Sequence, residues 1–285
     1  FLRLSMEDQE VSTAVKKRRV ASNSLWQQRL SAWRPIIHAS CVSGIMMIFG
    51  VVFVIIGAVV LQTSDKTVQT AKRYDDVCPK DSFCEVRIEI PEDMDAPVYF
   101  YYKLVNFYQN HRTYVQDFDI TQLQGEVFNT PDNQNTAINT CTISDVKERD
   151  GKTVYPCGLI ANSFFNDVFN ASVVSPNGLQ TEMLTDANWD GSDISWESDR
   201  KHKFRNASDR FQPLDPERVT RLGTRGNTLP LPTNQDFQVW FRVAGLPRFN
   251  KLYRKIGNRD LKKGETLVVT VANVFDVSGF DGEKH

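Results

Sequence analysis

The feature that most constrains the fold is an uncharged, strongly apolar run of 21 residues at positions 41–61. In a helix, about 1.5 Å per residue makes such a run about 32 Å long, which is enough to cross a hydrocarbon core of about 30 Å. A signal peptide is the competing interpretation, but about 35 mostly polar residues precede the run, and it is longer than a typical signal core. We therefore predict a transmembrane helix over residues 36–61.

The charges on either side of the run predict its orientation. Residues 1–40 carry seven basic and three acidic side chains, whereas the rest of the chain carries 27 basic and 32 acidic ones. Excess positive charge stays on the cytosolic side of a membrane helix. We predict that residues 1–35 form a cytosolic tail and that residues 62–285 form one lumenal or extracellular domain. A net charge of −1 offers no bulk attraction to nucleic acid, so no nucleic-acid partner is expected.

An even number of cysteines beyond the apolar run agrees with this orientation, because a lumenal or extracellular compartment permits disulfides. These are Cys78, Cys84, Cys141 and Cys157. Four cysteines allow three pairings, and sequence proximity favours joining the first two to each other and the last two to each other. Zinc binding is the alternative, but no C-x₂-C spacing exists to support it.

Two N-glycosylation sequons also lie only on the predicted lumenal side. They begin at Asn170 and at Asn206, each followed by alanine and serine. We expect N-glycans at both positions, and no metal or other cofactor.

Small residues recur every seven positions along the predicted membrane helix, at Ser43, Gly50 and Gly57. This spacing puts them on nearly one helix face, where small side chains let a second helix approach closely. Glycine is also simply common in membrane helices. Docking on a partner helix is therefore one of two open interpretations.

Residues 62–285 have the pattern of a mainly β (α+β) domain, with antiparallel sheets, short helices and long loops. Alternating or aromatic runs predict strands at 86–90, 98–102, 237–243 and 267–271. Helical spacing predicts short helices at 164–169 and 249–256, a turn at 175–178, and long polar loops at 129–140 and 205–235. The second helix would carry a basic face, either solvated or in contact with an acidic partner or anionic head groups. Its residues are Arg248, Lys251, Arg254 and Lys255.

Catalytic motifs are scarce. The sequence has no G-x-S-x-G, H-E-x-x-H, P-loop or G-x-G-x-x-G. Among only four histidines, His111 lies in an aromatic, amide-rich stretch and is interpreted as a structural residue rather than a base. Asp117 and Asp119 form a D-x-D pair, in which two carboxylates share a hard cation in membrane-anchored glycosyltransferases. A glycosyltransferase using this pair is the alternative function; otherwise we predict that the chain is no enzyme.

Six stretches, in order, carry a resemblance to a known family. They are QQRLSAWRP (27–35), YYKLVNFYQNHRTYV (101–115), PCGLIANSFFND (156–167), DISWESDRKHKFRN (193–206), FQVWFRVAGLPRFNKLYRKI (237–256) and FDG (280–282). Together they resemble the accessory β-subunits of type IV P-type ATPases, the lipid flippases, also called the cell-division-control protein 50 or ligand-effect modulator family. In that family Cys157 pairs with an upstream cysteine, a position that Cys141 fits.

The resemblance implies a non-catalytic subunit that forms a heterodimer with an ATPase α-subunit. It implies a need for this chain in the folding, endoplasmic-reticulum exit and activity of that subunit, which moves phospholipid from the exoplasmic to the cytosolic leaflet. The expected location is the membrane of the endoplasmic reticulum, Golgi, endosome or plasma membrane, in contact with its lipids. Family members carry a second transmembrane helix shortly after the FDG element, so one is expected beyond residue 285.

Two groups of residues are predicted to contact that partner. On the cytosolic side these are Gln28, Arg29 and Trp33. In the lumenal domain they are Tyr108, Asn110, His111 and Arg112, because tyrosine and arginine are typical interface anchors. The alternative for the second group is that it only builds the domain core.

Overall fold

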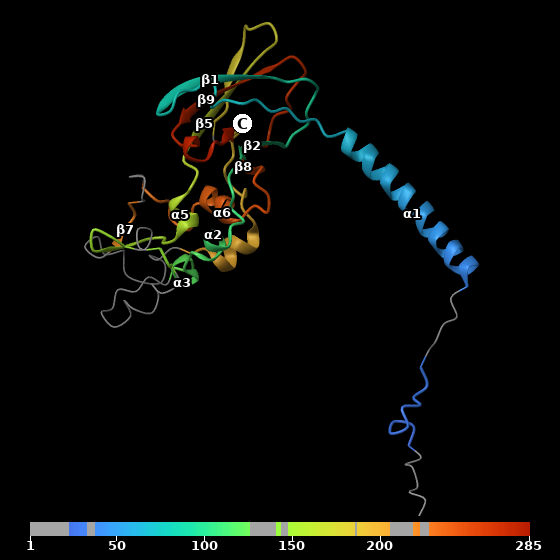
Figure 1. Cartoon of the computed structure of the whole chain (residues 1–285). Coiled ribbons are helices and arrows are strands. Elements are labelled where there is room, and N and C mark those ends of the chain that lie inside the picture. The colour runs from blue at the N-terminus through green and yellow to red at the C-terminus, as the bar shows by residue number, and fades with distance from the viewer. Residues whose placement is uncertain are drawn as a thin grey trace, which may run out of the picture. The chain divides into compact units, whose positions relative to one another are not determined.

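The computed structural model describes residues 23–32, 38–125, 141–143, 148–185, 187–205, 219–222 and 228–285. The chain divides into two compact units, Phe1–Lys66 and Thr67–His285. The first unit contains helix α1 (Ala39–Asp65), which is long and apolar enough to cross a membrane (Figure 1). None of the residues in α1 is buried within the chain. The helix continues one turn past the predicted end at residue 61, because uncharged Gln62, Thr63 and Ser64 still tolerate helical geometry.

The second unit, Thr67–His285, is named the β unit here, and its largest sheet has four strands in the order β1-β9-β5-β6. These are β1 (Ser82–Glu89), β9 (Thr266–Asn273), β5 (Val168–Val174) and β6 (Thr181–Met183). All pairs are antiparallel, with Val86 opposite Val269 and Ala171 opposite Val269 on the other side. Alternate residues of β9 are buried, which explains why the sequence alternation in this strand is a reliable signal.

A second antiparallel sheet has the order β10-β2-β8, formed by β10 (Glu283–Lys284), β2 (Val98–Val105) and β8 (Phe249–Ile256). A third, small sheet consists of β3 (Glu148–Arg149), β4 (Lys152–Val154) and β7 (Val219–Thr220). The mainly β prediction with antiparallel sheets is thus confirmed. Because β10 pairs with β2, the last described residues are held inside the fold rather than trailing from it.

Short helices complete the β unit. They are α2 (Arg112–Gln116), α3 (Ile120–Leu123), α5 (Leu159–Asn162), α6 (Gln235–Phe241), the π-helix η2 (Asp199–Lys203) and the 3₁₀ helix η4 (Ser278–Phe280). Figure 1 shows α2, α3, α5 and α6 gathered at the end of the unit opposite β1. Aromatic rings fill the space between, with Tyr102 stacked on Phe165 at 3.9 Å between centroids. Trp240 is fully buried and donates from its indole nitrogen to the carbonyl of Ile160 (2.9 Å).

The predicted strand at 237–243 is wrong, because this segment begins with helix α6. Asn234 caps the helix by accepting a hydrogen bond from the amide of Phe237 (3.0 Å). The helix buries Phe237, Trp240 and Phe241, which are spaced i, i+3 and i+4. The same apolar residues that alternate along a strand therefore also fit one helix face.

The predicted helix at 249–256 is also wrong, since this segment is strand β8. It pairs with β2 from Phe249 to Ile256, with one register shift opposite Phe100 and Tyr101, and that pairing overrides the helical spacing of its apolar residues. The predicted basic face does not form: Lys251 is buried, and Arg254 forms an ion pair with Asp236 at 2.6 Å. The predicted helix at 164–169 is also wrong. Helix α5 ends before this segment, at Asn162, and strand β5 begins within it, at Val168.

Candidate functional site

The segment from Asn106 to Arg112, between β2 and α2, turns alternate side chains inward and outward. Phe107 packs on Trp240 (5.5 Å between ring centroids). Gln109 is fully buried, and its side-chain oxygen accepts a hydrogen bond from the amide of Ala244 (2.9 Å). These inward residues fix the segment against the core, so their outward neighbours are held in place by a rigid support.

The outward residues of this segment are the ones that the sequence predicts for partner contact. Tyr108 is 58% exposed, and Asn110, His111 and Arg112 are exposed as well. His111 is the N-cap residue of α2, where its carbonyl oxygen accepts from Val115 and its ring caps no amide. The core interpretation does not fit these exposures.

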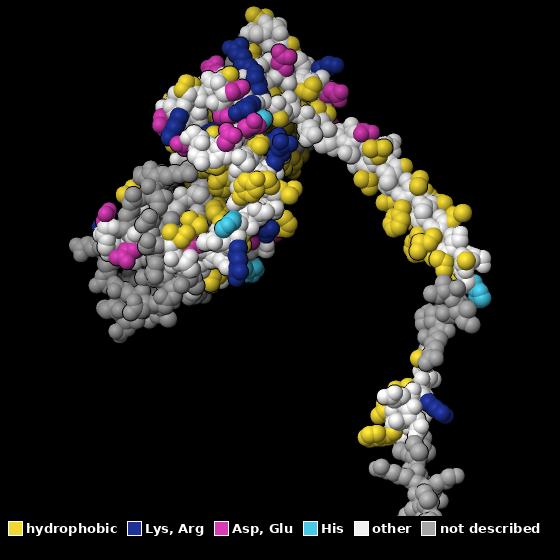
Figure 2. Space-filling model, in the orientation of Figure 1, with side chains coloured by type: hydrophobic (Ala, Val, Ile, Leu, Met, Phe, Trp, Pro, Cys, Tyr) yellow, Lys and Arg dark blue, Asp and Glu magenta, His cyan; other side chains and the backbone are white. Residues whose placement is uncertain are grey.

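A neighbouring loop extends this exposed region. The carbonyl of Gly245 accepts from the side chain of Asn110 (3.0 Å), and that of Pro247 accepts from the amide of Phe107 (3.2 Å). Leu246, between these two anchor points, is 70% exposed. Figure 2 shows hydrophobic side chains interspersed with basic and histidine ones on the face over β8, α6 and α2. We name Tyr108, Asn110, His111, Arg112 and Leu246 the 108–112 surface.

The sequence did not predict that Leu246 belongs to this surface, nor that Trp196 is exposed. The exposed fraction of Trp196 is 64%. The guanidinium of Arg242 lies 4.0 Å from the centre of the Trp196 ring and forms an ion pair with Asp199 at 2.7 Å. An exposed tryptophan held in place by an arginine is a second candidate for partner contact on the β unit. The only signal in the sequence was its place in a stretch shared with the family.

In the first unit, the predicted cytosolic contact residues are only partly described. Gln28 and Arg29 lie in a turn, where their amides donate to Leu25 and Ser24. Trp33 lies outside the described residues. The nearby Trp26 is 77% exposed, which makes it a further candidate that the sequence reasoning did not name.

The predicted small-residue face of α1 is sterically open. A Cβ added at Gly50 or at Gly57 would meet no atom within 4 Å apart from the adjoining backbone of its own helix. Ser43 is exposed in the same helix. Nothing within the described part of the chain occupies this face, so a second helix has room to approach it.

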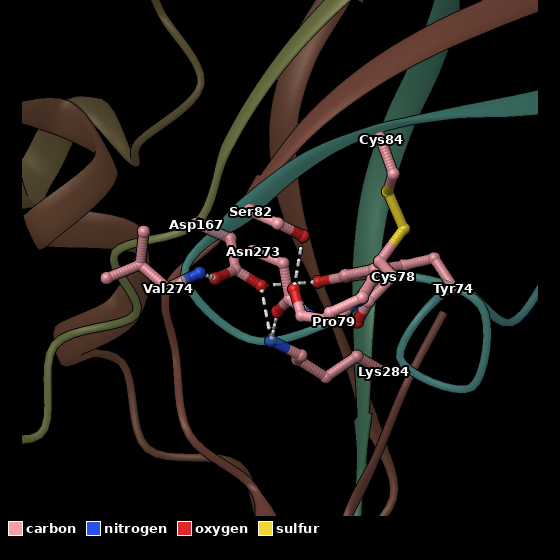
Figure 3. Close-up of a disulfide and its surroundings, with 9 residues drawn as sticks. All are labelled: Tyr74, Cys78, Pro79, Ser82, Cys84, Asp167, Asn273, Val274 and Lys284. Atoms are coloured by element: carbon pink, nitrogen blue, oxygen red, sulfur yellow. Dashed lines mark hydrogen bonds and ion pairs between the residues drawn. A yellow bond between two sulfur atoms is a disulfide. The ribbon is translucent and has the colours of Figure 1, made fainter.

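Both disulfides that sequence proximity favours are present, joining Cys78 to Cys84 and Cys141 to Cys157. The first closes the loop that leads into β1, and Figure 3 shows it beside a buried polar cluster. At the centre of this cluster the ammonium of Lys284 lies 2.8 Å from the carboxylate of Asp167, with side-chain exposures of 1% and 0%.

Every group around this ion pair is engaged. Asp167 also accepts from the hydroxyl of Tyr74 (2.7 Å) and from the amides of Val274 and Phe275. Lys284 also donates to the side-chain oxygen of Asn273 and to the carbonyl of Phe275. Burial and the charge of Asp167 hold the pKa of Tyr74 well above its usual range.

This cluster ties together segments that are far apart in sequence. Asn273 also donates to the carbonyl of Cys78 (2.6 Å), which links the first disulfide to the end of β9. Lys284 belongs to β10, and Asp167 immediately precedes β5. The chain entering the β unit, its central sheet and its last strand are thereby fixed to one another. Sequence reasoning did not find either charged residue, since each reads as a surface residue.

The D-x-D pair is structural. Asp117 is 1% exposed and accepts hydrogen bonds from the amides of Thr142 (2.7 Å) and Leu159 (2.8 Å). Asp119 is 3% exposed and caps α3 by accepting from the amides of Thr121 and Gln122. Carboxylates that are buried and engaged with backbone donors do not form an open cation site. In the part of the chain that the structure describes, no three His, Cys, Asp or Glu residues are placed to hold a metal ion.

The second disulfide is embedded in these contacts. Gln122 accepts a hydrogen bond from the amide of Cys157 (2.9 Å), and Gly158 follows with a φ of +101°. A Cβ at Gly158 would collide with the backbone of Asp117, so only glycine fits there. The PCGL stretch is thus explained by close packing around a disulfide.

Lys251 is a further buried charged residue of the β unit. Its ammonium donates to the carbonyls of Val239 (3.2 Å) and Trp240 (3.3 Å) and to that of Arg242, at the C-terminal end of α6. Burial, and secondarily the charge of Arg242, lower the pKa of Lys251 to about 7. A cation at a helix C-terminus meets the unsatisfied carbonyls there, so its role is to hold α6 against β8.

Of the two predicted sequons, only the one at Asn170 lies within the described residues. Asn170 is exposed on β5, whereas Asn206 lies outside the described residues. Asn170 therefore has access to solvent in the folded β unit.

Comparison with known proteins gives one consistent result. Residues 60–285 match the model of the LEM3 (ligand-effect modulator 3) family / CDC50 family. The chain is 32% identical over 292 residues to "ALA-interacting subunit 3" of Arabidopsis thaliana, covering 96% of this chain and 78% of that protein. It is 31% identical to "Cell cycle control protein 50A" of Mus musculus, covering 95% and 80%. It is 29% identical to "Phospholipid-transporting ATPase accessory subunit CRF1" of Saccharomyces cerevisiae, covering 95% and 76%.

Proposed function

Because the chain belongs to the LEM3/CDC50 family, we propose that it is the non-catalytic accessory subunit of a phospholipid-transporting ATPase. The observation that carries this proposal is the family match over residues 60–285, together with a relative that is named as such a subunit. The absence of an open D-x-D site supports it, since both Asp117 and Asp119 are engaged with backbone amides. The glycosyltransferase alternative is not supported.

In this assignment the partner is a P-type ATPase, which hydrolyses ATP and moves phospholipid from the exoplasmic to the cytosolic leaflet. The accessory chain is needed for the folding of that partner, for its exit from the endoplasmic reticulum and for its activity. A disulfide-braced unit with exposed aromatic and basic anchors suits a protein that holds another protein, because such residues dominate binding energies.

The proposed contacts lie on both units. The 108–112 surface binds the lumenal side of the ATPase, and the face of Ser43, Gly50 and Gly57 packs on one of its membrane helices. On the cytosolic side, Gln28, Arg29 and Trp33 contact the ATPase near the membrane.

The proposed orientation follows the positive charge of the N-terminal tail. Residues 1–35 are cytosolic and residues 62–285 are lumenal or extracellular, which is where disulfides and N-glycans at Asn170 and Asn206 form. The protein resides in the endoplasmic reticulum, Golgi, endosome or plasma membrane.

The test is to express a type IV P-type ATPase with and without this chain and to measure two quantities. We expect phospholipid-stimulated ATP hydrolysis, and transfer of labelled phospholipid to the cytosolic leaflet, only when the chain is present. A chain carrying Asp117→Asn and Asp119→Asn serves as the control for the alternative function if it still folds. Equal ATPase activity with and without the chain would contradict the proposal.

A further inference from the structure

A half-open cavity of about 340 Å³ lies beside strand β5. Strand β6 pairs with β5 over residues 172–174, and the earlier part of β5 lies beyond this pairing. Side chains take the place of the missing strand there. The hydroxyl of Tyr253 accepts from the amide of Phe169 (3.2 Å), and the indole of Trp189 donates to the carbonyl of Phe169 (3.3 Å). One side of the cavity is therefore built from aromatic rings.

Two charged groups form the polar part of the lining. Asp190 accepts from the amide (2.7 Å) and the hydroxyl (2.8 Å) of Ser192, bonds that hold its pKa below the usual range. Arg254 uses its two terminal nitrogens to bind Asp236. Its Nε atom faces Gly191, where an added Cβ would lie 3.1 Å away. The lining thus combines a carboxylate, a guanidinium N–H and aromatic side chains that are themselves largely buried.

Asn170 is both a lining residue of this cavity and the first residue of a sequon. It is exposed on β5, so a glycan attached to it begins at the cavity. Sugars are bound by this chemistry: hydroxyl and acetamide groups bond carboxylates and guanidinium N–H, and the ring face packs on apolar side chains. The cavity is at the small end of the range of ligand pockets, about 300–1,000 Å³, which suits one sugar residue.

We propose that this cavity binds the first N-acetylglucosamine of an N-glycan on Asn170, so that the glycan is packed against β5 and β8 as part of the fold. The proposal rests on the lumenal orientation given above. The sugar would cover the part of β5 that lies beyond its pairing with β6.

The first test compares the rate of deglycosylation of the folded chain with that of the unfolded chain. The chain is produced in eukaryotic cells together with its ATPase partner. Peptide-N-glycosidase F must reach the bond between asparagine and the first sugar, whereas endoglycosidase H cuts one sugar further out in the high-mannose glycans that the producing cells must therefore retain. We expect native release by the first enzyme to be at least tenfold slower at Asn170 than after unfolding, with endoglycosidase H much less affected. Asn206 provides a second glycan for comparison in the same chain. Absence of a glycan on Asn170, or equal native and unfolded rates, would overturn the proposal.

A variant that fills the cavity separates this protection from shielding by the partner. Gly191→Val places a branched side chain against Arg254, whereas Gly257→Val is the matched control, because a Cβ there meets open space. We expect Gly191→Val to speed native release at Asn170 at least fivefold, and Gly257→Val to leave it unchanged. Equal release from both variants, with unfolding temperatures that show them folded, would contradict binding in the cavity.

The sequon itself provides the third measurement. Ser172→Ala abolishes glycan attachment and Ser172→Thr retains it, while both leave Asn170 in place. We expect the first variant to unfold roughly 2–4 °C below the second. Identical unfolding temperatures would overturn the structural role of the sugar. Failure of the accessory-subunit assignment would appear separately, as loss of ATPase co-purification with the Asn170 protection intact.

Discussion

None of the residues of helix α1 is buried within the chain, whereas the β unit encloses an aromatic core and a fully buried ion pair. The β unit therefore satisfies its packing and polar groups by itself. Helix α1 satisfies its backbone internally, but its side chains need lipid and a neighbouring helix. The difference suggests that substitutions in the β unit act mainly on folding, and that substitutions on α1 and on the 108–112 surface act mainly on assembly.

The largest effect is expected from breaking the buried ion pair. Lys284→Ala leaves the carboxylate of Asp167 buried without its cation, which costs about 3–5 kcal/mol. We expect the unfolding temperature of the β unit to fall by roughly 6–20 °C, measured by thermal unfolding of the purified chain.

The matched control is Lys80→Ala. Lys80 pairs with Asp276 at 2.8 Å, but their side chains are 54% and 37% exposed, so about 0–1 kcal/mol is expected. Similar unfolding temperatures for the two variants would show that the buried cluster does not hold the β unit together.

The next largest effect is expected at high pH. Burial raises the pKa of Tyr114 to about 12 and raises the pKa of Tyr102 well above its ordinary value. Because the folded-state pKa exceeds the unfolded value of about 10, the stabilisation is complete below about pH 10 and is lost as the pH rises toward 12. For Tyr114 alone this amounts to about 3 kcal/mol.

The measurement is circular dichroism during alkaline titration. We expect the tertiary signal of the β unit to be lost while α1, which has no tyrosine, keeps its helical signal. Tyr114→Phe, which loses the hydrogen bond to Ser163 but keeps the ring, should reduce the loss above pH 10. Simultaneous loss of both signals would contradict the separation of the two units.

A smaller effect is expected at the 108–112 surface. Tyr108→Ala and Arg112→Ala should each weaken ATPase binding by about 1–2 kcal/mol, or about 5- to 30-fold, since exposed aromatic and arginine anchors carry much of an interface. The stability of the β unit should change by no more than about 0.5 kcal/mol.

Tyr99→Ala is the matched control for these variants, because Tyr99 is 48% exposed on β2 outside this surface. Binding is measured with the purified ATPase in detergent. Unchanged affinity for the two test variants, or an equal loss for Tyr99→Ala, would exclude the 108–112 surface as the lumenal contact.

The smallest effect is expected on α1. Gly50→Leu and Gly57→Leu block close helix approach and should weaken assembly by about 1 kcal/mol, with no change in the β unit. Val54→Leu, on the same helix and 72% exposed, is the control. Assembly that is unchanged by both glycine substitutions would exclude this face of α1 as a contact with a partner helix.

The sequence was sufficient where a single physical requirement fixes the pattern. An uncharged run long enough to span a bilayer predicts α1, and alternation in β1 and β9 predicts strands that bury one face. Sequence proximity also favoured the two disulfides that are present.

The sequence was insufficient where strand alternation and helical spacing both fit the same apolar residues. The apolar residues of α6 alternate as in a strand, but they also follow helical spacing, and the N-cap Asn234 was the overlooked signal. The apolar residues of β8 follow helical spacing, yet pairing with β2 decides its structure. The local sequence pattern of a segment does not show which distant strand it will pair with. A prediction of β8 from local spacing alone could therefore not find this pairing.

Polar contacts between residues far apart in the chain could not be predicted from the sequence either. Asp167 and Lys284 lie 117 positions apart, and nothing local marks either as buried. For the 108–112 surface, composition indicated an anchor-rich stretch, but only the structure shows which residues face outward.

We infer that this chain holds a P-type ATPase through surfaces that its own fold leaves open. The most direct measurement is native mass spectrometry of the chain purified in mild detergent from cells that also produce the ATPase. We expect a one-to-one complex that Tyr108→Ala and Gly50→Leu weaken while the β unit stays folded. A chain that purifies without any ATPase, although folded and disulfide-bonded, would contradict it.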